Sequence, residues 1–255
     1  MNLLELAKSA ALAAGRLQRE NFSQKISIRH KGEIDLVTEI DLASERLISD
    51  ILALSGLPIL GEEEVKTKPQ GTYWLVDPLD GTTNYAHGFP WFAPSIALMQ
   101  DKIPLLGVVY HVMMDELFWA EKGQGAFLNG RPLKVSAQES LSQALLATGF
   151  PYNVHDQPEP VVGAFRAFLV RAQGIRRAGA AALDLAYVAC GRLDGFWEIL
   201  LKPWDTAAGV LLVREAKGQV SDFLGQPYDP FVPHIVASNG KIHAEMISIA
   251  SSYTP

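Results

Sequence analysis

The chain has 255 residues, of which 48% are hydrophobic and 20% are charged, and its formal net charge is −6. This length allows one large domain or two closely packed ones with a sizeable core, and the composition is ordinary for a globular protein. The densest basic run is the pair Arg176-Arg177, which argues against nonspecific nucleic-acid binding as the main activity. An acidic protein that binds a phosphorylated substrate needs cations to receive it.

The cysteine content and the apolar runs bear on the compartment. Cys190 is the single cysteine, so a disulfide framework within the chain is impossible and a reducing cytosol is expected. The first residues include Glu5 and no basic segment, and their apolar spacing favours an amphipathic helix over a signal peptide. No apolar run approaches the roughly 20 residues of a membrane span. We therefore expect a cytoplasmic protein with no membrane partner.

The first half of the chain begins with two predicted helices. Apolar periodicity places them at about 2–21 and 38–54. Two short strands are expected next, at 58–61 and 73–76, and Pro78 is expected to end the second because proline cannot donate to a strand ladder. An antiparallel meander should follow, with strands at 93–99, 103–111, 116–120, 125–128 and 131–135.

From about residue 140, strand and helix signals alternate, which is typical of an α/β arrangement. Strands are expected at 144–148, 174–176, 194–199, 219–223 and 234–237, and helices at about 160–172, 180–190, 204–216 and from 241 onward. The junction near 136–142 lacks the features of a flexible linker. We therefore divide the chain into an α+β half, 1–139, and an α/β half, 140–255, packed as one compact unit.

The segment 77–84, DPLDGTTN, is the most informative stretch of the sequence. It sets Asp77 and Asp80 three positions apart at the end of an apolar strand, and Gly81 then permits a tight turn. Hard cations prefer carboxylate and carbonyl oxygens, whereas phosphates prefer the free N–H groups at a helix N-terminus, here beginning at Thr82. One turn can thus support metal-dependent phosphate chemistry. The alternative is an Asx-type turn with a solvated face.

Three further acidic positions each have a structural and a functional interpretation. Asp41 lies three residues after Thr38, so it either closes a capping box or faces a cleft and orients water. Glu62 is the first of three consecutive glutamates after a short strand, and it belongs either to a solvated loop or to a cation site, since adjacent like charges repel. Asp205 opens a helix, where it either complements the helix dipole or completes a metal site from the second half.

The order and spacing of these segments resemble the inositol monophosphatase family of magnesium-dependent, lithium-sensitive phosphomonoesterases, over nearly the whole chain. The resemblance rests on DLVTEID at 35–41, GEE at 61–63, WLVDPLDGTTN at 74–84 and WDTAAG at 204–209. The stretch AALDLAY at 181–187, followed by DGFWE at 194–198, is similar to the bacterial branch. The resemblance implies a layered αβαβα sandwich of the sugar phosphatase type, with the active site between the two halves.

The resemblance also implies a cofactor of two to three Mg²⁺ ions. The first ion would be held by Glu62, Asp77 and the backbone carbonyl of Leu79. A second would be held by Asp77, Asp80 and Asp205. A third, weaker ion near Glu62 is a family feature that the residues alone do not indicate.

Other matched positions would act on the substrate. Asp41 and Thr82 match the positions that orient the attacking water. The backbone donors to the phosphate match Gly81, Thr82 and Thr83, and the contacts to the sugar alcohol match Gly179, Ala180, Ala181, Glu198 and Asp205. Ala180 stands where many relatives have Thr or Ser, which weakens the expectation of a strict inositol preference. Lys31 falls in the loop that closes over the ions in the family, but the segment 31–41 is a residue shorter here, so its role stays open.

The expected reaction is hydrolysis of inositol monophosphate to inositol and phosphate by metal-activated water. The sequence contains no Ser-His-Asp nucleophile pattern and no phosphate-loop lysine motif. Alternatives are fructose-1,6-bisphosphatase activity or that of another small sugar or nucleotide phosphatase, for which Arg176 and Arg177 would receive a second phosphate. A further alternative is a binding role in a transcription complex, which some bacterial relatives have. A small phosphorylated polyol is the expected substrate, and the family usually forms homodimers.

Overall fold

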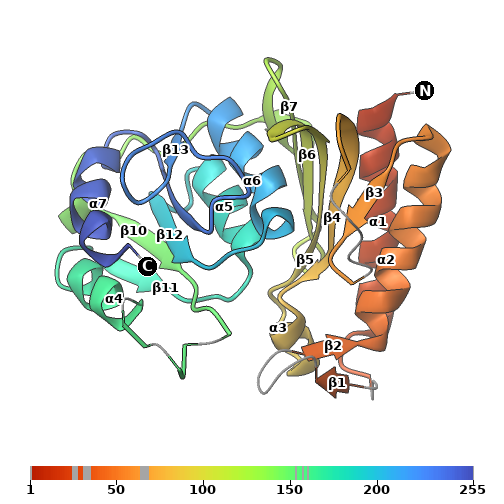
Figure 1. Cartoon of the computed structure of the whole chain (residues 1–255), viewed down its shortest axis with the longest axis horizontal. Coiled ribbons are helices and arrows are strands. Elements are labelled where there is room, and N and C mark those ends of the chain that lie inside the picture. The colour runs from red at the N-terminus through yellow and green to blue at the C-terminus, as the bar shows by residue number, and fades with distance from the viewer. Residues whose placement is uncertain are drawn as a thin grey trace.

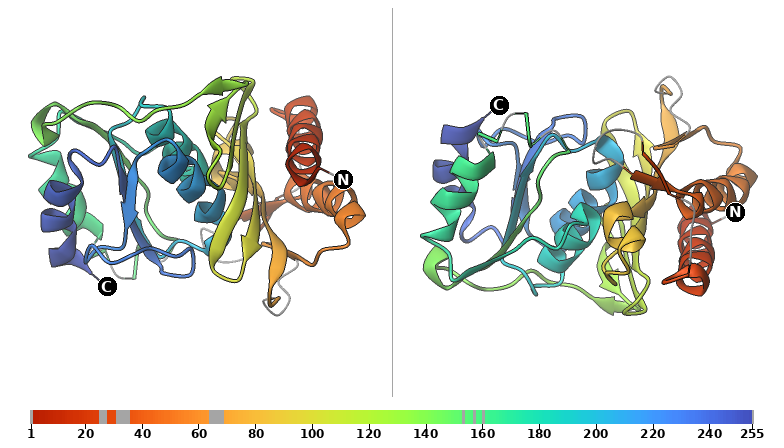
Figure 2. Two further views of the ribbon diagram at one scale, coloured as in Figure 1. Left: turned by 90° about the horizontal axis from the view of Figure 1, so that it is seen from above. Right: turned by 90° about the horizontal axis from the view of Figure 1, so that it is seen from below.

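The computed structural model describes residues 2–24, 28–30, 36–63, 69–152, 154–156, 158–159 and 161–254. Figure 1 shows five layers along the molecule: helices, a sheet, helices, a second sheet and helices. Both views in Figure 2 show the same order of layers. The predicted αβαβα sandwich is therefore confirmed.

The outer helical layer of the first half covers one face of the first sheet (Figure 2). It consists of α1 (Leu3–Asn21) and α2 (Glu39–Leu52), and the short 3-10 helix η1 (Ala53–Ser55) continues α2. Both helices were predicted to within two residues. The hairpin of β1 (Ile28–His30) and β2 (Leu36–Thr38), which leads into α2, was not predicted, because strands of three residues show no measurable periodicity.

The first sheet is the predicted meander with one parallel strand at its edge. Its strands follow chain order, and only β3 and β4 run parallel. Their bounds are β3 (Ile59–Gly61), β4 (Thr72–Asp80), β5 (Ala93–Gln100), β6 (Ile103–His111), β7 (Glu116–Glu121), β8 (Gly125–Leu128) and β9 (Arg131–Pro132). The helix α3 (Thr82–Ala86) follows β4 directly, as the sequence predicted.

The expectation that Pro78 ends its strand is wrong. Strand β4 continues through Pro78 to Asp80, and the pairing with β5 passes from Asp77–Ser95 to Asp80–Ala93. Three steps along β4 face two steps along β5, which is a β-bulge. The extra residue in a bulge is left outside the ladder, so the missing N–H of proline costs no ladder hydrogen bond there. As a result both aspartates lie within one strand, on either side of a bend.

The second half has the predicted alternation of strands and helices, but its sheet is mixed. The strand order is β11-β10-β12-β14-β13, and β14 runs antiparallel to both of its neighbours. The strands are β10 (Leu145–Thr148), β11 (Gly174–Arg176), β12 (Gly195–Ile199), β13 (Gln219–Ser221) and β14 (His234–Ser238). The helices are α4 (Val161–Leu169), α5 (Ala181–Ala189), α6 (Pro203–Glu215) and α7 (His243–Ala250), with 3-10 turns η2 (Leu141–Gln143) and η3 (Ser251–Tyr253).

Helices α5 and α6 form the middle layer and join the two sheets (Figure 1). A Cβ added to Gly107 of β6 would lie 2.8 Å from backbone atoms of Ala208 in α6, so this glycine permits very close approach of helix and sheet. One cluster of buried apolar side chains extends from the first sheet through these helices to the second sheet. The chain thus has a core that crosses residue 140, and its division into halves at this point stays a prediction. Among the described residues, no helix has the length and apolar character needed to cross a bilayer.

Candidate active site

The bulge of β4 holds two of the predicted metal ligands. Asp77 is almost fully buried, and its Oδ1 accepts a hydrogen bond of 3.0 Å from the N–H of Leu79. This bond is the Asx-type interaction expected from the structural interpretation of the segment. Asp80 Oδ2 accepts a 2.7 Å hydrogen bond from the N–H of Ala182, near the start of α5. The second aspartate therefore ties the first half of the chain to the second.

Four carboxylates from both halves lie close enough to influence one another. Burial raises the pKa of Asp77 well above its ordinary value, and Glu62, Asp80 and Asp205 raise it further. Burial and the neighbouring Asp205 likewise raise the pKa of Asp80. Burial raises the pKa of Asp205 to about 7, although the N–H of Lys202 opposes the shift. Clustered carboxylates of this kind are destabilising unless protons or cations neutralise them.

The donor chemistry of this cluster fits a hard divalent cation, because it consists of carboxylate oxygens beside a backbone carbonyl. Within the part of the chain that the structure describes, no three His, Cys, Asp or Glu side chains converge closely enough to form a ready-made coordination shell. The assignment of Glu62, Asp77, Leu79, Asp80 and Asp205 as metal ligands therefore stays a prediction. The pKa shifts show which of these side chains are electrostatic neighbours.

Asp41 has both of the roles that its sequence position suggested. As the third residue of α2 it closes the capping box, because its Oδ2 accepts hydrogen bonds from the N–H and the hydroxyl of Thr38. Its Oδ1 lies 2.7 Å from Oγ1 of Thr82, which is also 3.1 Å from the carbonyl of Leu79. Burial raises the pKa of Asp41, and the hydrogen bonds from Thr38 and Thr82 oppose this shift. The structure thus places the two predicted water-orienting side chains in direct contact.

The turn after β4 leaves the start of α3 without a side-chain cap. Gly81 has a φ of +93°, and a Cβ there would lie 2.8 Å from the carbonyl oxygen of Trp91, so only glycine fits. The chain can then enter α3 at Thr82 without a side-chain cap on its first N–H groups. The assignment of Gly81, Thr82 and Thr83 to phosphate binding stays a prediction that this geometry supports.

Asn84 connects this turn to the predicted substrate loop of the second half. Its Nδ2 donates within 2.8 Å of the carbonyl of Trp91, 2.9 Å of that of Ala178 and 3.2 Å of that of Gly179. Gly179 has a φ of +89°, and the side chains of Ala180 and Ala181 are buried. The loop 179–181 is therefore held beside the turn, and it offers backbone groups and no hydroxyl.

Two buried carboxylates lie deeper in the second half. Glu198 of β12 packs against the backbone of Gly149, where any Cβ would clash with its carboxylate. Burial raises the pKa of Glu198, Asp205 raises it further, and Arg177 lowers it. Asp184 of α5 is 1% exposed, and neither of its oxygens has a hydrogen-bond partner among the described residues. Sequence reasoning missed Asp184, although an acidic residue within the apolar run 181–190 was a visible signal.

A buttress from the first helix supports the bulge, and it was also missed. Gln18 of α1 is fully buried, and its Nε2 donates to the carbonyl of Pro78 at 2.7 Å and to Oγ of Ser44 at 3.1 Å. The hydroxyl of Tyr85 in α3 donates to the backbone carbonyl of Gln18 at 2.8 Å. The available signal was the spacing, because Gln18 continues the buried alanine face of α1 one turn beyond Ala14.

Three basic side chains had open roles. Arg176 and Arg177 are exposed at the end of β11, and the guanidinium of Arg177 lies 5.2 Å from the ring centre of Phe150. Arg177 acts as a counter-charge to the two buried carboxylates, since it lowers the pKa of both Asp184 and Glu198. Lys31 lies outside the described residues, so its predicted position cannot be compared with the structure.

The α/β sandwich of this chain is also the fold of solved inositol monophosphatase structures. The sequence profile of the inositol monophosphatase family matches residues 1–254. The chain therefore belongs to the inositol monophosphatase family, and it is a phosphatase by that membership.

Its relatives have several names. An inositol-1-monophosphatase of Synechocystis is 44% identical, over 99% of this chain and 89% of its own length. The Nus factor SuhB of Pseudomonas aeruginosa is 44% identical, over 99% and 97% of the two chains. A fructose-1,6-bisphosphatase/inositol-1-monophosphatase of Aquifex aeolicus is 40% identical, over 98% and 96%. The solved structure of an inositol monophosphatase from Anabaena has a TM-score of 0.89 at 40% identity, over 99% and 96%.

Proposed function

We propose that this chain is a Mg²⁺-dependent phosphomonoesterase that hydrolyses inositol monophosphate to inositol and phosphate. The observation that carries the proposal is the contact between Asp41 and Thr82, 2.7 Å apart, beside a buried carboxylate cluster drawn from both halves. An acidic site that repels its own substrate is useful only if cations fill it, so the electrostatics and the reaction support each other.

Two to three Mg²⁺ ions would be held by the carboxylate cluster. Glu62, Asp77 and the carbonyl of Leu79 would take one ion, and Asp77, Asp80 and Asp205 another. When bound, such ions lower the pKa of a water molecule and offset charge on the phosphoryl and leaving oxygens. Asp77 has two carboxylate oxygens and can therefore serve both positions.

The pair Asp41–Thr82 would orient the attacking water. The hydroxyl proton of Thr82 is directed at Asp41 Oδ1 or the carbonyl of Leu79, so the lone pairs of Thr82 Oγ1 can accept a hydrogen bond from water. A water that donates one proton there keeps a lone pair free for attack on phosphorus. Because the pair is buried and held by the cap of α2, this orientation needs little reorganisation during the reaction.

The phosphate and the alcohol would be bound by different elements. The N–H groups of Gly81, Thr82 and Thr83 would donate hydrogen bonds to the phosphate oxygens at the start of α3. Glu198, Asp205 and the loop Gly179-Ala180-Ala181 would contact the ring hydroxyls of the polyol. Since Ala180 offers no hydroxyl, we expect several small polyol phosphates to be hydrolysed, with inositol 1-phosphate among the best.

Other properties are proposed from the relatives alone. The name of the Aquifex relative supports fructose 1,6-bisphosphate as a second substrate, with Arg176 and Arg177 as receivers of the second phosphate. The name Nus factor SuhB supports an additional role in a transcription complex. Lithium sensitivity, a homodimeric state and a cytoplasmic location are proposed on family membership.

The central test is phosphate release from inositol 1-phosphate, fructose 1,6-bisphosphate and an aryl phosphate, with Mg²⁺ and with EDTA. We expect Mg²⁺-dependent turnover that Asp77→Asn lowers by about 10³-fold, which corresponds to ~4 kcal/mol of transition-state stabilisation. A folded Asp77→Asn protein with near-normal turnover at saturating Mg²⁺ would exclude the two-ion assignment. Retention of activity in EDTA would exclude the metal requirement.

A further inference from the structure

One face of α2 makes contact with three separate parts of the active site. Asp41, Ser44 and Glu45 follow the i, i+3, i+4 spacing that places side chains on the same side of a helix. Asp41 contacts Thr82, and Ser44 accepts from Gln18, which supports the bulge. Glu45 contacts the third part of the site, which is the end of β3 that leads into Glu62.

Glu45 is buried, with 5% of its surface exposed, and it is packed on the backbone of that strand end. Its Oε2 accepts a 2.8 Å hydrogen bond from the N–H of Glu63. A Cβ added to Gly61 would lie 2.6 Å from Cδ and Oε1 of Glu45, so the glycine is what allows the carboxylate to reach the strand. The two residues on either side of Glu62 are therefore both in contact with Glu45.

The sheet does not fix the position of Glu62. Strand β3 pairs with β4 only as far as Gly61–Val76, and Glu62 and Glu63 lie beyond this last pair. Hydrogen bonding to a helix side chain thus continues where the strand ladder stops. The position of Glu62 matters because the proposed function assigns its carboxylate, with Asp77 and the carbonyl of Leu79, to one Mg²⁺ ion.

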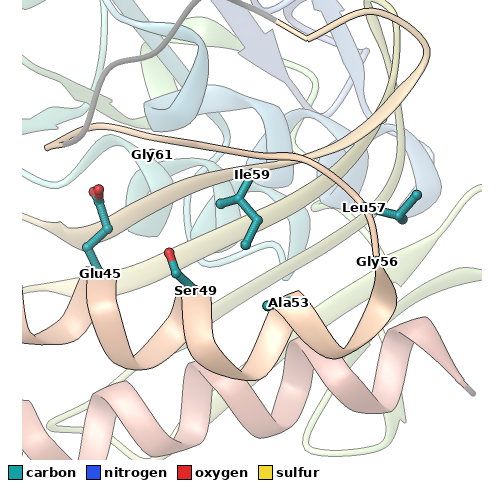
Figure 3. A pocket seen from close by; sticks show the side chains of 7 residues that line it. All are labelled: Glu45, Ser49, Ala53, Gly56, Leu57, Ile59 and Gly61. Atoms are coloured by element: carbon teal, nitrogen blue, oxygen red, sulfur yellow. The ribbon is translucent and has the colours of Figure 1, made fainter.

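Two hollows are lined in part by Glu45. A cavity of about 430 Å³ lies between α2 and β3, and Glu45 and Gly61 line one end of it (Figure 3). A second hollow of about 220 Å³ is also lined by Glu45 and Ser49, together with Leu42, Arg46, Asp50 and Glu63. In Figure 3 the Glu45 carboxylate points from the helix toward the strand, whereas Ser49 lies one turn further along the helix. Glu45 thus meets the strand end where α2 and β3 leave space between them.

We propose that Glu45 is a positioning residue that holds the segment 61–63 on α2 and thereby keeps Glu62 within reach of the proposed Mg²⁺ site. This inference rests on the proposed function, because it concerns the affinity of that site for its cation. Glu45 contacts neither substrate nor reacting atoms in this assignment. Its removal should weaken cation binding and leave the chemistry at saturating cation nearly unchanged, as is common for residues that orient ligands.

The test compares Glu45→Ala and Glu45→Gln with wild type and with the control Ser49→Ala. Ser49 lines the same cavity, but the hydrogen bond to the N–H of Glu63 comes from Glu45. Calorimetric titration of the metal-free proteins with MgCl₂ measures affinity directly. The Mg²⁺ concentration for half-maximal hydrolysis of inositol 1-phosphate measures it independently. We expect the dissociation constant for Mg²⁺ and the half-maximal Mg²⁺ concentration both to rise about 10-fold in Glu45→Ala. The kcat at saturating Mg²⁺ should stay within about twofold of wild type.

Glu45→Gln retains an oxygen that can accept from Glu63, so it should remain within about threefold of wild type. Ser49→Ala should not change the affinity. Unchanged Mg²⁺ affinity in Glu45→Ala, even with a lower melting temperature of the metal-free protein, would make the role merely structural and overturn the inference. An equal loss in Ser49→Ala would do the same. If Glu45→Ala fails to fold, the test rests on Glu45→Gln. A Mg²⁺ affinity of that variant 10-fold below that of wild type would also contradict the inference.

Failure of the proposed function has a different signature. A wild-type protein that binds no Mg²⁺ and releases no phosphate from any phosphomonoester would overturn that function, and this inference with it, before any variant is compared. A wild type with Mg²⁺-dependent activity and an unaffected Glu45→Ala variant would overturn the inference alone.

Discussion

At the scale of single residues, the carboxylates of the site share one arrangement. One oxygen of Asp41, Asp77, Asp80 and Asp205 accepts a hydrogen bond from a backbone N–H group within the fold. In the last three of these residues, the other oxygen accepts no hydrogen bond from any described residue. The backbone bond orients the side chain, and the second oxygen remains for a ligand. The structural and functional interpretations of these positions are therefore compatible in every case.

Residues that support the site by holding its backbone were harder to predict than the proposed metal ligands. The sequence indicates Asp77 and Asp80 because they end an apolar strand three positions apart, and it indicates Asp205 because it opens a helix. Glu45 and Gln18 lie within ordinary helical periodicity, and only the fold shows that they reach Glu63 and Pro78. Contacts between distant segments depend on packing, which a single sequence does not specify.

Asp184 should make the stability of the metal-free protein depend on pH. Burial raises its pKa well above the ordinary value, and nearby Glu198 adds to the shift. A raised folded-state pKa means that the folded protein retains a proton that the unfolded chain releases above about pH 3.9. This contribution to stability is full below that pH and is lost as the pH rises through the folded-state pKa.

We therefore expect Asp184→Asn to increase the free energy of unfolding at pH 8 by about 1–3 kcal/mol, with a smaller gain at pH 5. Chemical denaturation in EDTA at the two pH values measures this. Asp50→Asn, which changes an exposed carboxylate on α2, serves as the control. Its effect on the free energy of unfolding should be the same at pH 5 and pH 8. A gain for Asp184→Asn that is the same at both pH values would show that its charge is not the cause.

Glu198 should select the alcohol and not the phosphate. Its carboxylate is buried beside Asp205 in the second half, away from the pair Asp41–Thr82. Losing a hydrogen bond from a ring hydroxyl in such a site costs about 1–3 kcal/mol. Glu198→Gln should therefore change the ranking of inositol 1-phosphate among polyol phosphates and leave an aryl phosphate nearly unaffected. A uniform loss over all substrates in steady-state kinetics would place Glu198 in the catalytic or structural set.

At the scale of elements, periodicity predicted the helices better than the strands. Helices α1 and α2 were located within two residues because each has a long apolar face and an N-terminal cap. The cap is Asn2 in α1 and Thr38 in α2. Strand β4 was cut short because Pro78 was assumed to end it, whereas a bulge accommodates the proline. The antiparallel direction of β14 in a mostly alternating half could not be predicted, since strand order depends on tertiary packing.

The contact between α1 and the bulge should contribute to stability. Gln18→Leu keeps the side-chain size but removes the Nε2 donor to Pro78 and Ser44. Leaving the Pro78 carbonyl unpaired in a buried position should lower the free energy of unfolding by about 1–3 kcal/mol. Gln18 Oε1 has no partner among the described residues, so its removal should recover part of this loss. Urea denaturation measures the net change in the free energy of unfolding. A variant more stable than wild type would show that burying Gln18 destabilises the fold more than its hydrogen bonds stabilise it.

At the scale of the whole molecule, the site is assembled from elements far apart in the sequence. Strand β4 provides Asp77 and Asp80, α2 provides Asp41, and α6 provides Asp205. The hydrogen bond from Ala182 to Asp80 and those from Asn84 to residues 178 and 179 cross between the halves. A cation shared by these carboxylates would bind the folded chain and not the unfolded one, so it should stabilise the assembled protein by mass action.

The melting temperature should therefore rise with Mg²⁺ in wild type, with a stabilisation of about 2.7 kcal/mol at a concentration 100 times the dissociation constant. The rise should be smaller in Asp205→Asn, because the amide lacks the charge that attracts the ion. Asparagine keeps an oxygen for the N–H of Lys202, which caps α6 through Asp205, so the helix start is preserved. Differential scanning calorimetry with and without Mg²⁺, at ionic strength matched with NaCl, separates ion binding from screening. Equal Mg²⁺-induced shifts in the two proteins would show that Asp205 does not join the halves through a cation.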